Sequence, residues 1–138
     1  LHSLSHLHAA EDVRACLQGV RRTLRPGGRL AFAVHNPDPA VLARDPAEVY
    51  RIHQGVSDVA VYESSRYDSA QELLHLSWFV ETFEGTERFD YTLRLFFPAE
   101  VLEVLHCNGY ILEGRYGWYD RSAFTEESGT QVIVARRD

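Results

Sequence analysis

The feature that most constrains the fold is a short apolar run that follows a proline-glycine turn. Leu30–Val34 reads Leu-Ala-Phe-Ala-Val and carries no polar side chain on either face. Such a run is typical of a strand in a parallel sheet that is covered on both faces. A helix is predicted before it over residues 10–24, because apolar side chains recur there every three or four positions. Pro26-Gly27-Gly28 ends that helix, so the segment predicts one helix–strand unit of a doubly wound α/β sheet.

The middle of the chain has a different pattern. Residues 58–67, 72–83 and 88–97 alternate apolar and polar side chains, which predicts three antiparallel strands with one buried face. A hairpin turn is predicted at residues 84–87. Beyond it we expect a helix that begins at Pro98 and is capped by Gly109, a strand over Tyr110–Tyr116 and a buried strand over Thr130–Ala135.

Composition excludes several classes of protein. The chain has 138 residues, enough for about one domain. Its net charge of -6 argues against a nucleic-acid partner or an anionic membrane, and no apolar run reaches membrane-spanning length. Cys16 and Cys107 lie within apolar helical patterns and are expected to be buried, reduced thiols. Residues 1–8 are predicted to be a loop with a few apolar side chains. They lack the pattern of a signal peptide, so a cytoplasmic location is expected.

The chain contains no methionine and begins at Leu1. A natural reading frame starts with methionine, so we expect the sequence to be a piece of a longer protein or a processed chain.

Motifs at both ends of the chain resemble class I S-adenosylmethionine-dependent methyltransferases. Ser3-Leu4-Ser5-His6-Leu7, a helix and then Leu24-Arg25-Pro26-Gly27-Gly28 are similar to the segment that links strands four and five in that family. Asn108-Gly109-Tyr110, after the helix that begins at Pro98, resembles the entry into strand six, and Val132–Arg136 resembles strand seven. In that family, strand seven lies antiparallel between strands five and six.

The resemblance implies a partial Rossmann-like methyltransferase sheet of strands five to seven, over residues 1–138, with an antiparallel insertion at about 57–97. It implies a parent enzyme that uses S-adenosylmethionine as its cofactor and methylates nitrogen or oxygen of a small molecule. The family holds this cofactor with a glycine-rich turn after strand one and an acidic residue after strand two. The sequence contains no G-x-G-x-G motif, so we expect the chain alone to be inactive.

The alternative from another class is a non-catalytic β-rich module for dimerisation or ligand binding that contains a Pro-Gly-Gly turn. Upstream coding sequence and strand order distinguish the two. The apolar strand at 30–34 has one expected neighbour within the chain, the strand at 130–135, so its other edge is open. If the chain is stable alone, we expect it to form a homo-oligomer such as a dimer through that edge, or to pack its middle layer across the edge.

Candidate site residues follow from the resemblance and from the end of the buried strand. His6 is the candidate catalytic base, and Ser3 and Leu4 are candidate remnant contacts to the cofactor. Asn36 ends the strand on the side where open α/β sheets bind ligands. The candidate substrate-binding residues are Asn36, Tyr116, Trp118 and Tyr119.

Each candidate has a plainer alternative. In the plainer interpretation, His6 is a histidine of a surface loop and Asn36 forms a turn with Pro37. The aromatic residues Tyr116, Trp118 and Tyr119 then close the core instead of lining a pocket. No metal site is predicted, because His2, His6 and His8 lie close together in a short leader without a partner carboxylate. The other aromatic set, Trp78 and Phe79 with Phe96, is expected to form core or a dimer face.

Overall fold

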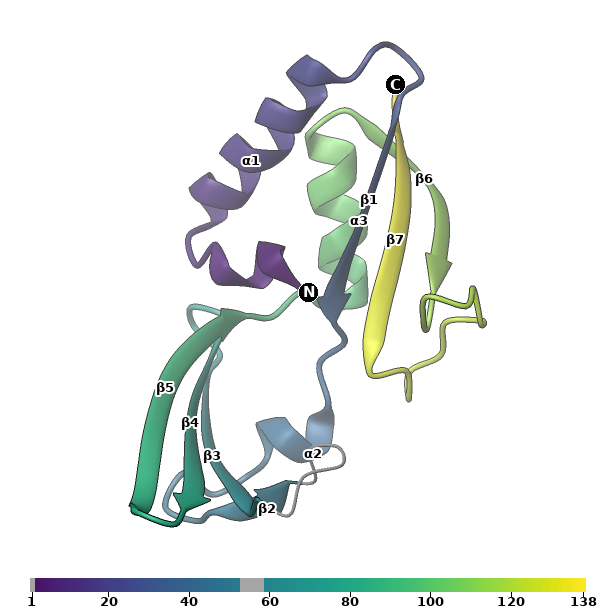
Figure 1. The fold of residues 1–138 in the computed structure, drawn as a ribbon. Helices are drawn as coiled ribbons and strands as arrows, with labels where there is room; N and C mark the ends of the chain where they lie inside the picture. Colours follow the sequence, from purple (N-terminus) through teal and green to yellow (C-terminus); the bar gives the residue numbers. More distant parts are fainter. Residues whose placement is uncertain (1, 53–58) are drawn as a thin grey trace. The chain divides into compact units, whose positions relative to one another are not determined.

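The computed structural model describes residues 2–52 and 59–138, which form two compact units. Unit one combines residues 1–38 with residues 94–138, and unit two comprises residues 39–93 (Figure 1). Unit one is therefore discontinuous in sequence. No helix in the part of the chain that the structure describes is long and apolar enough to cross a membrane.

Unit one is a three-stranded sheet with two helices and a short 3-10 helix. Its elements are η1 (Ser3–His6), α1 (Ala10–Thr23), β1 (Arg29–His35), α3 (Pro98–Cys107), β6 (Tyr110–Tyr116) and β7 (Thr130–Arg137). The strand order is β1-β7-β6, and β7 runs antiparallel to both neighbours. Arg29 pairs with Arg136 at one end of the β1–β7 ladder, and His35 pairs with Thr130 at the other. This is the arrangement that the resemblance implied, with its strand seven antiparallel between strands five and six.

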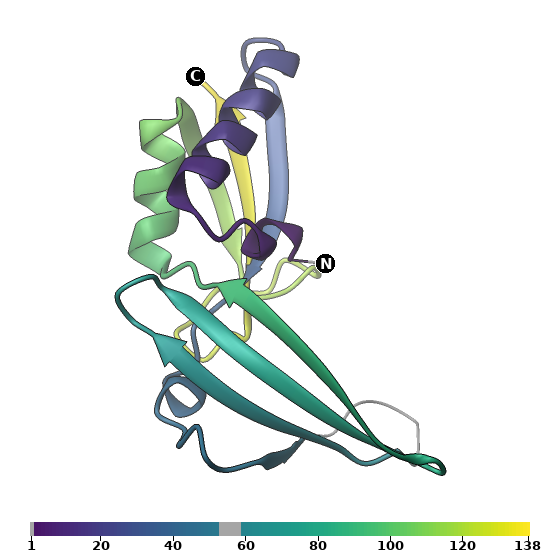
Figure 2. The ribbon, with the colours of Figure 1, turned by 90° about the vertical axis from the view of Figure 1, so that its left-hand side faces the viewer.

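Both helices cover the same face of this sheet (Figure 2). The first contributes Val13 and Leu17 to the core, and the second contributes Val101 and Leu105. They pack on the alternate strand residues that point to one side, among which Val34, Ile133 and Ala135 have no exposed surface. Full burial of a valine or isoleucine side chain contributes about 1.5–3 kcal/mol relative to leaving it exposed. The core of unit one therefore lies between the sheet and its two helices.

Buried polar side chains tie these elements together. The Tyr110 hydroxyl donates to the Leu17 carbonyl at 2.8 Å, which joins β6 to α1. The side chain of Gln131, fully buried on β7, donates to the Phe96 carbonyl at 2.7 Å. These bonds pair the backbone carbonyls of Leu17 and Phe96. A buried carbonyl without a partner would lower the free energy of unfolding by about 1–3 kcal/mol.

The Pro-Gly-Gly turn closes against the end of β7. Gly27 has φ of 73°, a left-handed conformation that glycine adopts without a steric penalty. Its amide donates to the Arg137 carbonyl, and the Arg137 amide donates to the Gly28 carbonyl. The Arg137 guanidinium donates to the carbonyls of Arg21 and Leu24 at the end of α1. The turn thereby fixes α1, β1 and β7 at one corner.

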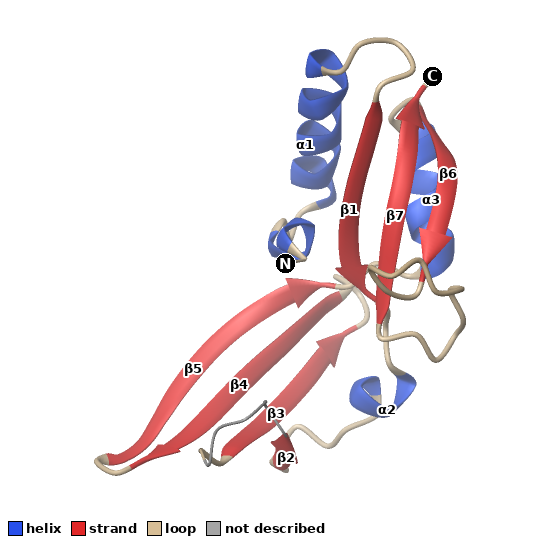
Figure 3. Cartoon of the chain, turned by 45° about the vertical axis from the view of Figure 1, so that its right-hand side comes forward, coloured by secondary structure: helices blue, strands red, loops and turns tan. Residues whose placement is uncertain are grey.

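Unit two is a four-stranded sheet with a single turn of helix (Figure 3). Its elements are α2 (Pro39–Leu42), β2 (Tyr50–Ile52), β3 (Val61–Asp68), β4 (Leu73–Thr82) and β5 (Gly85–Arg94), whose last residue belongs to unit one. The order is β2-β3-β4-β5, with β2–β3 and β3–β4 antiparallel. The three strands predicted from alternation therefore form one sheet.

A polar and aromatic cluster holds this sheet to the segment before it. Glu63 on β3 accepts from Arg44 at 2.7 Å and from the Trp78 indole at 2.6 Å. Trp78 also packs edge-on against Tyr91 of β5, with ring centroids 5.3 Å apart. Burial, followed by the negative charge of Glu63, raises the pKa of Tyr91. The carboxylate is thus satisfied by two donors from different elements.

Several predicted boundaries differ from the structure. The hairpin turn is Phe83-Glu84 rather than residues 84–87, because β5 already begins at Gly85. The strand ends at Arg94 rather than at residue 97, and Phe96 lies in the unit-one core instead of beside Trp78. The first of the three predicted strands began at residue 58, which lies outside the described residues. The short elements β2 and α2 were not predicted, because three or four residues carry no readable period.

Three local expectations were wrong. Residues 3–6 form a 3-10 helix rather than a loop. Cys16 and Cys107 are free but exposed, because each lies on the flank of its helix and the buried stripe is formed by other positions. The strand β1 was expected to be covered on both faces. Ala31 is exposed, because α1 and α3 both pack on the opposite face.

Candidate functional site

A cavity of about 370 Å³ lies on the face of β1 that the helices do not cover. Residues 31–33 of β1 form its floor, and His2, Ser3 and Leu4 form one wall. Tyr119, from the loop after β6, and Val132 of β7 complete the lining. The cavity is therefore built entirely within unit one. Its surface is mostly apolar with a few polar groups, the usual character of a site for a small ligand.

The 3-10 helix holds the first wall of the cavity in place. Ser5 is only 1% exposed, and Leu4 and Leu7 pack against the unit-one core. His2 caps the start of this helix with φ of 63°, which is uncommon for a residue other than glycine. The apolar anchors thus fix a short segment that would otherwise be free to move.

His2 and His35 form a stacked pair beside the cavity. Their ring centroids lie 3.9 Å apart, and the ring planes differ by 23°. Burial lowers the pKa of His35 from 6.5 to about 4, and positive charge at His2 and then at His6 acts in the same direction. Burial also lowers the pKa of His2. Both imidazoles are therefore neutral near pH 7 and able to accept hydrogen bonds.

Three buried polar atoms near the end of β1 lack a hydrogen-bond partner among the described residues. They are Nδ1 of His2, Oγ of Ser5 and Oδ1 of Asn36. The amide nitrogen of Asn36 is used, since it donates to the Glu126 carbonyl at 3.0 Å. Unpaired buried polar groups are rare in native structures and often mark a place where a ligand or ordered water binds.

The structure brings some of the predicted site residues together and separates others. Ser3, Leu4 and Tyr119 line the cavity. His6 is exposed and does not line it. Asn36 is buried directly after β1, within reach of the loop that precedes β7.

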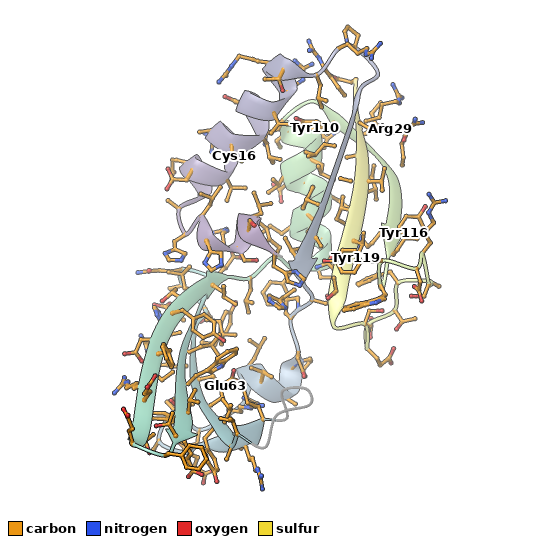
Figure 4. All side chains as sticks on the ribbon, in the orientation of Figure 1. Cys16, Arg29, Glu63, Tyr110, Tyr116 and Tyr119 are labelled. Atoms are coloured by element: carbon orange, nitrogen blue, oxygen red, sulfur yellow. The ribbon has the colours of Figure 1, made fainter. Side chains whose placement is uncertain are left out.

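The aromatic residues after β6 have separate positions. Tyr116 ends β6 and lies over Gly114, where the methyl group of an alanine would come within 2.7 Å of its hydroxyl. Trp118 is 54% exposed and packs edge-on against Tyr119, with ring centroids 5.1 Å apart. Figure 4 shows Tyr116 and Tyr119 beside β6 and β7. Only Tyr119 of this group contacts the cavity.

Sequence reasoning did not single out His35. It placed His2, with Ser3 and His6, in the loop that the resemblance puts beside the methyl group of the cofactor, but it named His6 as the candidate base. The available signal was a histidine directly after a buried apolar strand, a position where side chains face ligands in α/β sheets. Within residues 2–52 and 59–138, no group of three histidine, cysteine or acidic side chains could hold a metal ion.

The residues of the cavity do not fit an entire S-adenosylmethionine molecule. Dinucleotide-type sites hold ribose hydroxyls with a carboxylate and approach the ligand through glycine backbone. The described lining contains neither an acidic side chain nor a glycine. The lining instead consists of an imidazole, a serine, a tyrosine and aliphatic or aromatic side chains.

No family model matches the sequence, and no curated protein matches it. Solved structures do match. The CcbJ methyltransferase from Streptomyces caelestis is 24% identical over the whole chain, with a TM-score of 0.86. The chain has the fold of the carboxy-terminal part of such methyltransferases. An S-adenosylmethionine-dependent methyltransferase from Clostridium acetobutylicum gives a TM-score of 0.74 at 14% identity. CalS10, an amino pentose methyltransferase from Micromonospora echinaspora, gives 0.57 at 17% identity.

The chain spans a little over half of each of these structures, namely 58%, 55% and 56% of their lengths. The expected fold class, a partial Rossmann-like sheet with an antiparallel insertion, is confirmed by this match.

Proposed function

We propose that the chain is the carboxy-terminal part of an S-adenosylmethionine-dependent methyltransferase that methylates nitrogen or oxygen of a small molecule. The observation that supports this most strongly is the strand order β1-β7-β6, with β7 antiparallel to both neighbours. The whole chain superimposes on solved methyltransferase structures, so no part of it requires another fold.

In this proposal the cavity beside β1 binds the methyl acceptor. Tyr119 and Val132 supply walls for an apolar or sugar ring, and Asn36 holds the adjoining loop through its bond to Glu126. His6 remains the candidate base from the sequence, although its side chain is exposed in this chain. CalS10 acts on an amino pentose, and KedS8 from Streptoalloteichus is a sugar N-methyltransferase. An amino sugar is therefore the first acceptor class to test.

Three further properties belong to the proposal. The chain alone lacks catalytic activity, since its residues supply no complete cofactor site. The parent enzyme acts in the cytoplasm. The 138-residue chain forms a homo-oligomer, because β1 lies at an edge of the three-stranded sheet within the described residues. Light scattering after size exclusion tests the last of these. A monomer at high concentration would contradict it.

Calorimetric titration with S-adenosylmethionine tests the function. It is carried out on the 138-residue chain and on the same chain extended by the sequence encoded upstream of Leu1. Binding by the extended form alone is the expected result. Absence of binding by both forms would refute the proposal and favour a non-catalytic module. Tight binding by the short chain would refute the inference that its cofactor site is incomplete.

A further inference from the structure

Two large aromatic side chains are exposed in the loop between β6 and β7. Trp118 is 54% exposed and Tyr119 45%, and their rings pack edge-on with centroids 5.1 Å apart. Aromatic side chains bury about 150–250 Å² each when they are covered, so keeping two of them in water is unfavourable. Single apolar residues are normal on a protein surface, whereas a contiguous exposed group is typical of a binding site. The pair is therefore a candidate binding surface.

The loop holds the two rings in a tight turn. The Arg121 amide donates to the Trp118 carbonyl at 3.2 Å, and the Gly117 amide donates to the Ser122 carbonyl at 2.9 Å. Arg121 has φ of 66°, the left-handed conformation that commonly follows a tight turn. The Asp120 carboxylate accepts from the Ser122 amide at 2.9 Å. Because the backbone is fixed before any ligand arrives, binding at these rings costs little conformational entropy.

Tyr119 connects this turn to the cavity beside β1. Its side chain lines the cavity of about 370 Å³, whereas Trp118 does not. Since the Trp118 ring packs on the Tyr119 ring, the aromatic surface continues from the cavity wall onto Trp118. A molecule small enough to lie inside the cavity contacts Tyr119 alone. A molecule that also covers the indole has to extend beyond the cavity.

The surroundings of Trp118 restrict the chemistry of what covers it. An indole has a broad apolar face and one N–H donor, so it packs best against another ring or a hydrocarbon group. The exposed neighbours Asp120 and Arg121 carry opposite charges, so together they favour neither an anion nor a cation. Two rings are also far too small a surface for a specific protein partner, which covers about 800 Å² on each side. A neutral ring on a small molecule meets all three conditions.

We infer that the methyl acceptor has two parts. The first carries the amine or hydroxyl group and lies in the cavity, and the second is an apolar ring that packs on Trp118. This inference rests on the proposed function and narrows its substrate class to a glycoside of an amino sugar with a ring-bearing aglycone. Trp118 is then a specificity-determining residue, which distinguishes the glycoside from the free sugar and takes no part in the chemical step.

The first test uses the 138-residue chain labelled with fluorotryptophan and follows both indoles by fluorine NMR. The Trp118→Phe variant assigns the two signals, and Trp78 serves as an internal control because its indole is already bonded to Glu63 in unit two. Phenyl β-D-glucosaminide should shift the Trp118 signal in a saturable way and leave the Trp78 signal unchanged. D-glucosamine should shift neither. A Trp118 signal that does not respond to the phenyl glycoside would overturn the inference.

Variants separate the ring contact from a general effect on the fold. The wild-type chain should bind the phenyl glycoside about tenfold more tightly than D-glucosamine, measured by calorimetry, and Trp118→Ala should remove this preference. Trp118→Phe keeps a ring and should retain most of it. Phe83→Ala is the matched control, because Phe83 is a fully exposed aromatic residue of unit two. Survival of the preference in Trp118→Ala, or its loss in the control, would overturn the role of Trp118.

The second test measures methyl transfer by the extended protein to the same two probes. Trp118→Ala should raise KM for the phenyl glycoside about tenfold with kcat unchanged, and should leave both constants unchanged for D-glucosamine. If the variant transfers methyl groups to both probes as the wild type does, the inference is wrong and the proposed function stands. If the extended protein binds no S-adenosylmethionine, the proposed function fails, whereas the fluorine signal still decides whether a ring packs on Trp118.

Discussion

Replacing His35 by phenylalanine should flatten the dependence of stability on acidity. The folded protein holds the pKa of His35 at about 4, whereas in the unfolded chain it returns to 6.5. Between these values the unfolded chain binds a proton that the folded chain refuses, so stability is complete above about pH 6.5 and falls as the pH is lowered toward about 4. The full effect would be about 3 kcal/mol. Because the ring keeps some contact with solvent, we expect roughly half of it.

The assay is urea unfolding at about pH 7 and about pH 4.5, read from the amide NMR signals of β1 and β7 so that unit one alone is measured. The wild-type chain should lose roughly 1–2 kcal/mol more than His35→Phe across this interval. His8→Phe is the control and should follow the wild type. An equal loss in wild type and His35→Phe would show that His35 is not held neutral by the fold, and would refute the reasoning.

Other predictions concern the polar ties of each unit. Tyr110→Phe removes the bond to the Leu17 carbonyl and should destabilise unit one by about 1–2 kcal/mol, measured by urea unfolding of that unit. Glu63→Gln breaks the mostly buried pair with Arg44 and should cost unit two roughly 3 kcal/mol; an unchanged midpoint would contradict this. Gly109→Ala should lower the melting temperature of unit one by several degrees, because φ is 74°, a left-handed conformation that residues with a side chain adopt only with strain.

The parts of the fold that local chemistry dictates could be predicted from the sequence. The helix before the Pro-Gly-Gly turn and the apolar strand after it were found because their periods and breakers lie within a few residues of one another. The strand at Tyr110–Tyr116 was found in the same way, with matching bounds. The end of β5 was not predicted, because the alternation of side chains continues past Arg94. Only packing in unit one determines that the Phe96 ring leaves the sheet.

The candidate site was predicted less completely. Ser3, Leu4 and Tyr119 were named and do line the cavity. His2 lines the cavity, whereas His6, at the end of the 3-10 helix, is exposed and does not line it. Since that turn was expected to be a loop, the two histidines could not be distinguished. The contact between His2 and His35 joins segments 33 positions apart, and no local pattern encodes it.

The discontinuity of unit one sets the order in which the chain is able to fold during synthesis. Its β1 strand pairs along its length with β7, and Arg29 meets Arg136 across roughly a hundred intervening residues. At about 5–20 residues per second, a ribosome needs on the order of ten seconds to make that interval. Unit two is contiguous, so it is complete while β1 still lacks its only partner in the described sheet. The ladder between β1 and β7 therefore forms only after unit two has been synthesised, so unit one is the last of the two units to be completed.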